Sequence, residues 1–264
     1  MMDFTVKKYE ELLTTLKEAG YEFITYSDYC QLRGDLPSKF VILRHDVDKR
    51  PENSLRIARL ENKFGARATY YFRAVSCSWN EEIIKEIAGL GHEIGYHYES
   101  LTTCNGDKAL AFEEFKSNLL KLRALASVKT ICMHGSPRSK FDSRDLWKEF
   151  SYKELGIIGE PYLDTDFSKV FYLTDTGRRW DGFKVSLRDK IEGWSERWIN
   201  AGLVFHTTDD VIQAVKDGKF SFCVMITSHP QRWNPAGWSW ISELIVQNLK
   251  NTVKRAVAFI RRDS

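Results

Sequence analysis

Short apolar runs alternate with helical segments along most of the chain, and four of the runs end on clusters of polar, chemically reactive residues. Residues 39–44, 68–72 and 220–227 are apolar runs, whereas 51–65 and 107–126 carry apolar residues at helical spacing. This alternation predicts parallel strands joined by helical crossovers. We therefore expect an α/β protein whose chemistry lies at the carboxyl ends of its strands.

The length of the chain indicates how many domains to expect, and its charge indicates which partners to expect. The chain has 264 residues, with 39 Lys plus Arg against 36 Asp plus Glu. That length can bury a large core, and barrels of roughly 200–250 residues are often single domains. The balanced charge gives no electrostatic reason to expect a nucleic-acid partner. We expect one domain over residues 1–264, with an N-terminal helical extension at about 1–36 and an inserted region at about 135–200.

Cysteine usage and the apolar runs bear on location. The five cysteines are scattered, and no pair has CxxC spacing. This pattern favours neither a disulfide framework nor a thiolate zinc site. The N-terminus lacks the apolar stretch of a secretory signal, and no run approaches the roughly 18 apolar residues of a membrane span. The sequence therefore predicts a cytoplasmic location and no transmembrane segment.

Two aspartates follow the strand predicted over residues 39–44. In an extended segment, Asp46 and Asp48 point to the same side, and His45 and Val47 to the other. Two neighbouring carboxylates repel unless a cation lies between them. A divalent metal held by one, with the other acting as base, would satisfy both. A solvated pair capping the helix that begins near Pro51 explains the spacing equally well.

Histidines end three further strands. His97 and Glu99 share one face of their predicted strand, with His92 on the other, and His134 and His229 each follow an apolar run. A neutral imidazole is a good zinc ligand. A core histidine bonded to a backbone carbonyl is the simpler interpretation of any one of them. Clusters at four strand ends together favour a shared site.

A glycine-bounded loop over residues 177–182 contains Arg178, Arg179 and Trp180. Two guanidinium groups beside an indole could bind an anionic or sugar group. A structural loop held by an Arg–Asp pair is the alternative interpretation, and slightly the better one.

The last predicted helix spans roughly residues 236–262. Apolar residues gather on one side of it and charged residues on another. Packing against the barrel is the expected use of the apolar side, and binding to a membrane surface is the alternative.

Three phrases together resemble the polysaccharide deacetylase (NodB-homology, carbohydrate esterase 4-like) superfamily. They are Arg-His-Asp-Val-Asp at 44–48, Ala-Arg-Ala-Thr-Tyr-Tyr-Phe-Arg at 66–73 and Gly-His-Glu-Ile-Gly-Tyr-His at 91–97. The resemblance covers about residues 38–100 and extends to the strand end near 229. It implies a distorted, incomplete (β/α) barrel, commonly seven-stranded. It also implies a metal-dependent hydrolase that removes acyl groups, usually N-acetyl groups, from amino sugars.

The resemblance also implies a role for each motif residue. Asp46 corresponds to the general base, Asp48 and His97 to metal ligands, and His229 to the general acid. The implied cofactor is a divalent metal, zinc foremost, with cobalt, nickel or manganese as alternatives.

One position departs from the family pattern. The family's second ligand histidine lies four residues after the first, and here Leu101 occupies that position. A complete ligand set then needs another donor, for which His134 is the first choice and Glu99 the second.

The expected function is deacylation of an amino sugar in polysaccharide or glycoconjugate biosynthesis. Trp180 and Trp233 are expected to flank a sugar ring, and Arg178 or Arg179 to meet a phosphate or carboxylate on a carrier. Two alternatives stay open. Leu101 favours a non-catalytic carbohydrate-binding relative, and the ligand set also suits a metal-dependent hydrolase of another C–N bond or of a phosphate ester.

Overall fold

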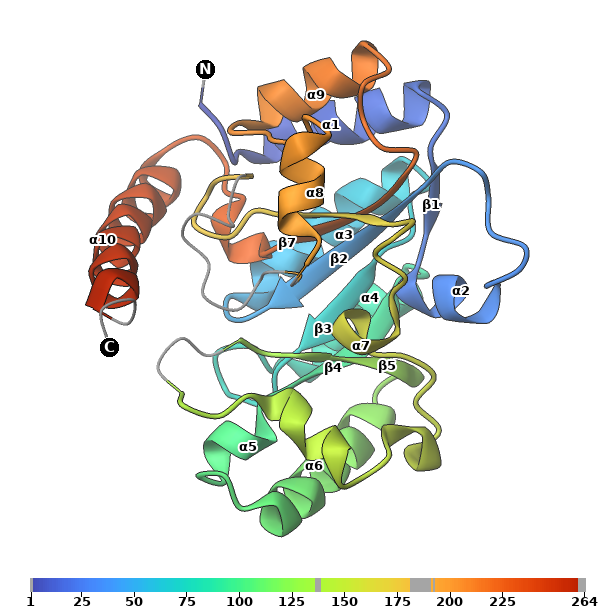
Figure 1. Cartoon of the computed structure of the whole chain (residues 1–264), viewed down its shortest axis with the longest axis vertical. Coiled ribbons are helices and arrows are strands. Elements are labelled where there is room, and N and C mark those ends of the chain that lie inside the picture. Colours follow the sequence, from blue (N-terminus) through green and yellow to red (C-terminus); the bar gives the residue numbers. More distant parts are fainter. Residues whose placement is uncertain (1, 136–138, 181–190, 192, 261–264) are drawn as a thin grey trace.

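Seven parallel strands form one sheet in the order β5-β4-β3-β2-β7-β6, with β1 paired to the start of β2 (Figure 1). The fold is described from a computed structural model over residues 2–135, 139–180, 191 and 193–260. The strands are β1 (Glu22–Ile24), β2 (Phe40–Val47), β3 (Thr69–Phe72), β4 (Glu93–Tyr98), β5 (Val128–Met133), β6 (Phe171–Thr174) and β7 (Cys223–Ser228).

Helices cover the sheet and carry the chain between its strands. The α-helices are α1 (Val6–Glu18), α2 (Tyr26–Gln31), α3 (Pro51–Lys63), α4 (Glu81–Gly89), α5 (Ser100–Thr103), α6 (Lys108–Arg123), α7 (Pro161–Asp164), α8 (Ser195–Asn200), α9 (Thr208–Lys216) and α10 (Trp238–Ile260). Short 3₁₀ turns are η1 (Ser143–Lys148), η2 (Tyr152–Leu155) and η4 (Pro230–Arg232). In the part of the chain that the structure describes, no helix has both the length and the apolarity needed to cross a bilayer.

The predicted fold class is confirmed. All strand pairs are parallel, and the sheet stays open between its edge strands β5 and β6, as expected of an incomplete seven-stranded barrel. The stretch expected to be an insertion contains β6, which pairs with β7, and the stretch expected to be a helical extension contains β1. Both stretches therefore build the sheet instead of being added to it.

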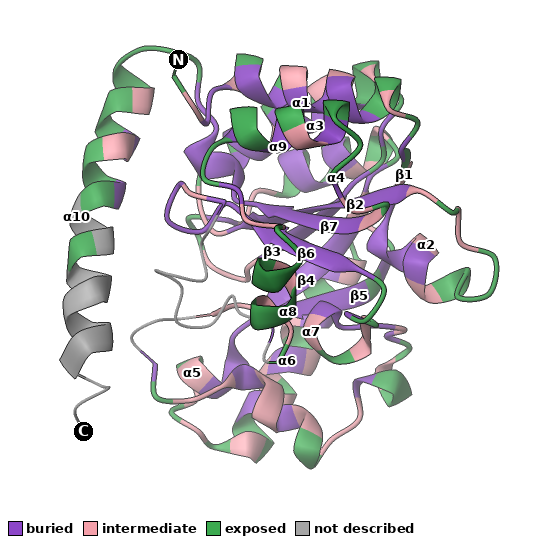
Figure 2. Cartoon of the chain, turned by 45° about the horizontal axis from the view of Figure 1, so that its top comes forward, coloured by how far each residue is buried: buried purple, intermediate pink, exposed green. Residues whose placement is uncertain are grey.

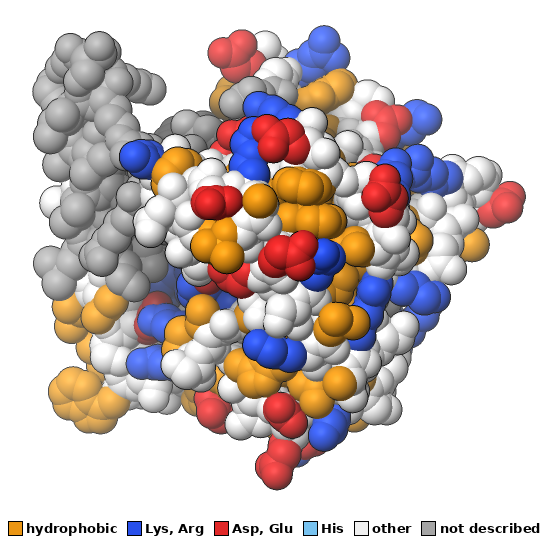
Figure 3. Space-filling model, turned by 90° about the horizontal axis from the view of Figure 1, so that it is seen from below, with side chains coloured by type: hydrophobic (Ala, Val, Ile, Leu, Met, Phe, Trp, Pro, Cys, Tyr) orange, Lys and Arg blue, Asp and Glu red, His pale blue; other side chains and the backbone are white. Residues whose placement is uncertain are grey.

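Charged groups of both signs mix with hydrophobic side chains on the face shown in Figure 3. No broad area of one charge covers that face. This distribution agrees with the nearly balanced composition.

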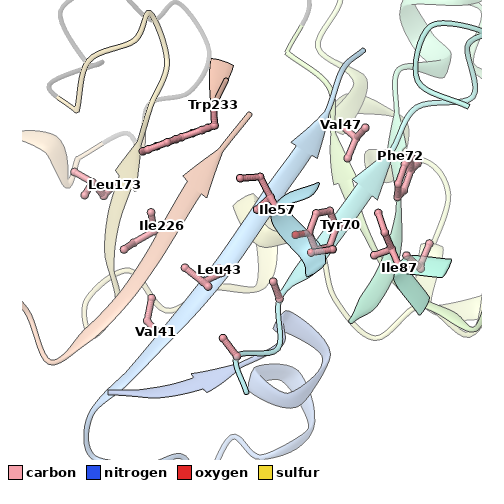
Figure 4. Close-up of a cluster of buried hydrophobic side chains, with 14 of the residues drawn as sticks. Val41, Leu43, Val47, Ile57, Tyr70, Phe72, Ile87, Leu173, Ile226 and Trp233 are labelled. Carbon is pink, nitrogen blue, oxygen red and sulfur yellow. The ribbon is translucent and has the colours of Figure 1, made fainter. Parts of the chain in front are cut away.

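The central strand β2 is buried at every position, and its alternation sorts side chains to two faces. Val41, Leu43 and Val47 point into the larger hydrophobic cluster, where Ile57 of α3 packs (Figure 4). Phe40 and Ile42 belong to a second cluster on the opposite face. By the same period of two, His45 lies on the first face, and Arg44 and Asp46 lie on the second.

His45 joins a buried hydrogen-bond network around the Glu61 carboxylate on the first face. Its Nε2 lies 2.6 Å from Glu61 Oε1, and its Nδ1 lies 2.7 Å from Ser228 Oγ. The hydroxyls of Tyr9 and Tyr70 donate to the two oxygens of Glu61 at 2.5 and 2.6 Å. Because a buried carboxylate is costly unless fully hydrogen-bonded, these contacts tie α1, α3 and β3 to the ends of β2 and β7.

Replacing Tyr70 with Phe should destabilise the protein by about 1.5–3 kcal/mol, the range for a hydrogen bond to a charged partner. Tyr21→Phe is the matched control, because the Tyr21 hydroxyl donates to the neutral carbonyl of Ser221. That control should cost about 0.5–1.5 kcal/mol. Urea unfolding measures both, and an equal cost for the two variants would contradict a charged Glu61.

Candidate metal centre

Five of the predicted site residues meet at the carboxyl edge of the sheet. Asp46 lies near the end of β2 and Asp48 directly follows that strand, His97 lies in β4, and His134 and His229 directly follow β5 and β7. Parallel strands bring these ends to one edge because each crossover returns the chain to the opposite side. The alternation that places Asp46 and Asp48 on one face is therefore seen in the structure.

The Asp48 carboxylate is the centre of this group. His134 Nε2 lies 3.4 Å and His97 Nε2 3.7 Å from Asp48 Oδ1, and His229 Nε2 lies 4.0 Å from Asp48 Oδ2. Gln231 Nε2 donates to the same Oδ2 at 3.2 Å. Three imidazole nitrogens thus face one carboxylate from three different strands.

The outer nitrogens of two of these rings are fixed by hydrogen bonds. His97 Nδ1 donates to the carbonyl of Cys132 at 2.9 Å, and His134 Nδ1 lies 2.8 Å from Glu99 Oε2. The other Glu99 oxygen accepts from Arg73 Nε at 2.9 Å. An Nδ1–H that donates outward leaves the Nε2 lone pair free to face the centre. Glu99, the second choice for a ligand, instead orients His134.

The residues fit a divalent cation. Asp48 Oδ1 is buried and has no hydrogen-bond partner within the described part of the chain. It belongs, with one nitrogen each of His97 and His134, to a group whose atoms lie within 4.8 Å of one another. Ligand atoms about 2.0–2.1 Å from a tetrahedral ion lie about 3.3 Å apart, close to the separations here. A cation would satisfy the unpartnered oxygen.

The pKa shifts of His97 and Asp48 also favour a bound cation. Burial lowers the pKa of His97 to about 4, although Asp46 opposes the shift, so this imidazole is neutral near pH 7. Burial opposes ionisation of Asp48, but the surrounding imidazoles outweigh it and lower the pKa of this carboxyl. Asp48 and His97 are therefore deprotonated, as metal ligands must be.

A second group, Asp46, His97 and Cys132, also lies within bonding range of a single ion. Arg44 makes it the weaker site. The guanidinium holds both Asp46 oxygens, with Nε at 2.9 Å from Oδ1 and Nη2 at 2.7 Å from Oδ2. A buried positive charge beside Asp46 repels a cation, and its two hydrogen bonds occupy one lone pair on each oxygen.

His229, which is not one of the three candidate ligands, has a carboxylate partner of its own. Asp175, directly after β6, holds His229 Nδ1 at 2.6 Å and accepts from Trp233 Nε1 at 2.9 Å. Burial and Arg232 lower the pKa of His229, but Asp175 outweighs them, and the pKa is raised overall. This imidazole therefore holds a proton more firmly than a free one.

The sequence reasoning missed three residues of the site. Asp175 follows the short strand β6 within the stretch expected to be an insertion, Arg44 belongs to the 44–48 phrase but has no role predicted from it, and Arg73 orients Glu99. The signal that would have found Asp175 is a polar residue directly after an apolar run, the same rule that selected His134 and His229.

The predicted sugar-stacking residues are not at this site. Trp233 is fully buried and Trp180 is 3% exposed, and both pack against Phe4 in the core. Neither indole presents a face to a ligand, so the expectation that they flank a sugar ring is wrong. The aromatic side chains complete the core next to β7.

The predicted anion-binding arginines lie on the loop after β6. Arg178 is buried, and its Nη1 and Nη2 donate to the carbonyls of Trp240 and Asp3 at 3.3 and 3.4 Å. It therefore ties the two ends of the chain together, which agrees with the structural interpretation. Arg179 lines a surface pocket with His206, and its role as an anion ligand stays a prediction.

Leu101 is buried in the hydrophobic cluster, in α5. It cannot reach the centre as a donor. The His134 ring instead lies 5.2 Å from the His97 ring, so a neighbouring strand supplies the second imidazole.

Glu99→Gln should weaken binding of zinc about 10–100-fold, the usual effect of removing the carboxylate that orients a ligand histidine. His206→Gln is the control, because His206 is exposed and lies outside the ligand group. Competition with a chromophoric chelator measures both affinities. Equal affinities for the two variants would show that zinc does not bind through His134.

No protein-family model and no curated protein matches the chain. Several solved structures are similar to it. A family 4 carbohydrate esterase (CE4) pseudoenzyme from Bacillus anthracis shares 15% identity over 82% of this chain and 61% of its own, with a TM-score of 0.46. A mutant pseudoenzyme with restored enzymatic activity also matches, with 14% identity and a TM-score of 0.46 over 82% of this chain and 63% of its own. The chain thus spans less than two thirds of either matched protein.

Two more matches cover more of the partner chain. A Streptococcus mutans CE4 esterase shares 15% identity over 91% of this chain and 89% of its own, with a TM-score of 0.45. Bacillus subtilis PdaA shares 11% identity over 88% and 80%, with a TM-score of 0.41. These proteins are all family 4 carbohydrate esterases or pseudoenzymes of that family.

Proposed function

We propose that the chain is a divergent polysaccharide deacetylase, a metal-dependent hydrolase that removes an N-acetyl group from an amino sugar. The observation that supports it best is the buried, unpartnered Asp48 Oδ1 facing the Nε2 atoms of His97 and His134. These three residues would hold the ion. When bound, a divalent metal polarises the amide carbonyl and lowers the pKa of a water molecule.

Asp46 is the proposed general base. Its Oδ2 lies 3.8 Å from His97 Nε2, so the carboxylate borders the ligand group without belonging to it. Burial opposes its ionisation, but Arg44 and His97 outweigh burial and lower the pKa of Asp46. Arg44 thus keeps the carboxylate ionised and in one orientation, ready to take the proton of the attacking water.

His229 is the proposed general acid. Asp175 holds its Nδ1, and its Nε2 faces the same carboxylate as the ligand histidines. Because the pKa of His229 is raised above its ordinary value, chiefly by Asp175, the ring holds a proton more firmly than a free imidazole and can give it to the departing amine. The acid and the base thus lie on neighbouring strands, β7 and β2.

Replacing Asp46 with Asn should lower acetate release from N-acetylglucosamine oligomers by about 10²–10⁴-fold, the usual contribution of a general base. Zinc binding should persist, because Asp46 is not in the ligand group. Asp217→Asn, on an exposed surface pair with Lys219, is the control. Zinc-loaded protein that releases no acetate from any N-acetylated sugar would overturn the proposal.

The second candidate is a carbohydrate-binding relative without activity, favoured by Leu101 in place of the usual ligand. In that case no substrate is turned over, and Asp46→Asn leaves glycan binding unchanged. A hydrolase of another bond would instead release phosphate or open a cyclic amide in the same substrate panel. The cytoplasmic location stays a prediction, which fractionation of cells would test.

A further inference from the structure

Helix α10 stands beside the body of the molecule (Figure 1), and exposed residues lie along the part of it that Figure 2 colours by burial. Trp238 is 84% exposed, Ile245 55% and Ile241 38%, and Val246 is exposed as well. Trp238, Ile241 and Ile245 follow one another at three- and four-residue spacing, and Val246 is next to Ile245, so the four form one stripe along the first turns of the helix. We call Trp238, Ile241, Ile245 and Val246 the α10 stripe.

The opposite, polar side of the helix is the one attached to the body. Glu243 is buried, and its Oε2 lies 3.6 Å from Lys49 Nζ and 3.9 Å from Arg50 Nη1. Trp240 Nε1 donates to the carbonyl of Asp3 at 2.6 Å. A surface helix of a globular protein normally turns its apolar stripe to the core. Within the part of α10 whose side chains are described, Ile241 and Ile245 are exposed instead, so the expectation that they pack on the barrel is wrong.

The sequence from residue 249 to 262 is positively charged, which favours a negatively charged partner. From residue 249 to 262 the chain has no Asp or Glu, and it has five basic residues: Lys250, Lys254, Arg255, Arg261 and Arg262. Apolar residues continue among them at helical spacing, at positions 249, 253, 257 and 260. A helical sequence with an apolar stripe that includes Trp, and with basic residues elsewhere, is typical of helices that lie in the membrane interface.

We propose that α10 lies on the surface of an anionic membrane, with the α10 stripe inserted at the boundary of headgroups and acyl chains. Indole side chains favour this boundary, and anionic lipid headgroups attract Lys and Arg. A second copy of the chain is the less suitable occupant. Pairing two α10 stripes would bring two segments of like positive charge together.

The position of α10 next to the candidate metal centre indicates a class of substrate. Lys49 and Arg50, which hold Glu243, directly follow Asp48 of the candidate metal centre. A membrane-bound α10 would therefore keep that centre near the lipid surface. Resting on the proposed function, this placement favours an amino sugar carried on a lipid anchor as the substrate class.

Vesicle sedimentation of the full chain tests the proposal. The protein should bind phosphatidylcholine vesicles that contain about 30% phosphatidylglycerol, and bind about tenfold less to phosphatidylcholine alone or in about 0.5 M NaCl. The variant Trp238→Ser/Ile241→Ser/Ile245→Ser should lose binding. Leu110→Ser/Leu120→Ser is the matched control, because it removes two exposed apolar side chains of α6 and should bind normally.

A fluorescence measurement keeps the test valid if the triple variant does not fold. Trp238 is the most exposed of the exposed large hydrophobic side chains in the described chain, so its emission should shift to the blue on the anionic vesicles. Trp238→Phe should abolish that shift while the protein still binds.

Three results would overturn the proposal. The first is no binding to anionic vesicles, and the second is binding that the triple variant retains. The third is a concentration-dependent dimer, seen by sedimentation equilibrium and abolished by the triple variant, without vesicle binding. Asp46→Asn should bind vesicles like the unmodified protein, so a failure of the proposed deacetylase activity leaves this measurement independent.

Discussion

The buried charges along the central strand β2 are the constraint on which the structure depends. On one face, His45 pairs with Glu61, and on the other, Arg44 holds both oxygens of Asp46. A buried charge is stable only when it is paired and hydrogen-bonded, so each pair demands its partners from neighbouring elements. His45 also bonds Ser228, which ties β2 to β7. Asp48 follows Asp46 by two residues, at the end of the strand, and faces the histidines.

In each histidine of the site, one ring nitrogen faces Asp48 and the other is held by a hydrogen bond. Two carboxylates and one carbonyl hold the outer nitrogens: Glu99 for His134, Asp175 for His229, and Cys132 for His97. Each hydrogen bond fixes which nitrogen faces Asp48. The difference in partner also sets protonation, since the pKa of His97 falls by burial while Asp175 raises that of His229. A ligand and an acid thus arise from the same side-chain type.

Much of this could be predicted from sequence because it follows local rules. The period of two places Asp46 and Asp48 together, and the strand-end rule selects His134. Partners distant in sequence could not be predicted. A tryptophan can stack on a sugar ring or pack in a core, and the sequence does not say which. Trp180 and Trp233 pack in the core because both contact Phe4. The amphipathic pattern of α10 does not show which side docks.

The most direct test of the central claim is X-ray absorption at the zinc edge of the zinc-loaded protein. Coordination by Asp48, His97 and His134 predicts only nitrogen and oxygen neighbours, at about 2.0–2.2 Å, with the multiple-scattering signature of imidazole. A zinc–sulfur distance of about 2.3 Å would instead place the ion with Cys132. That result would contradict a centre built on Asp48.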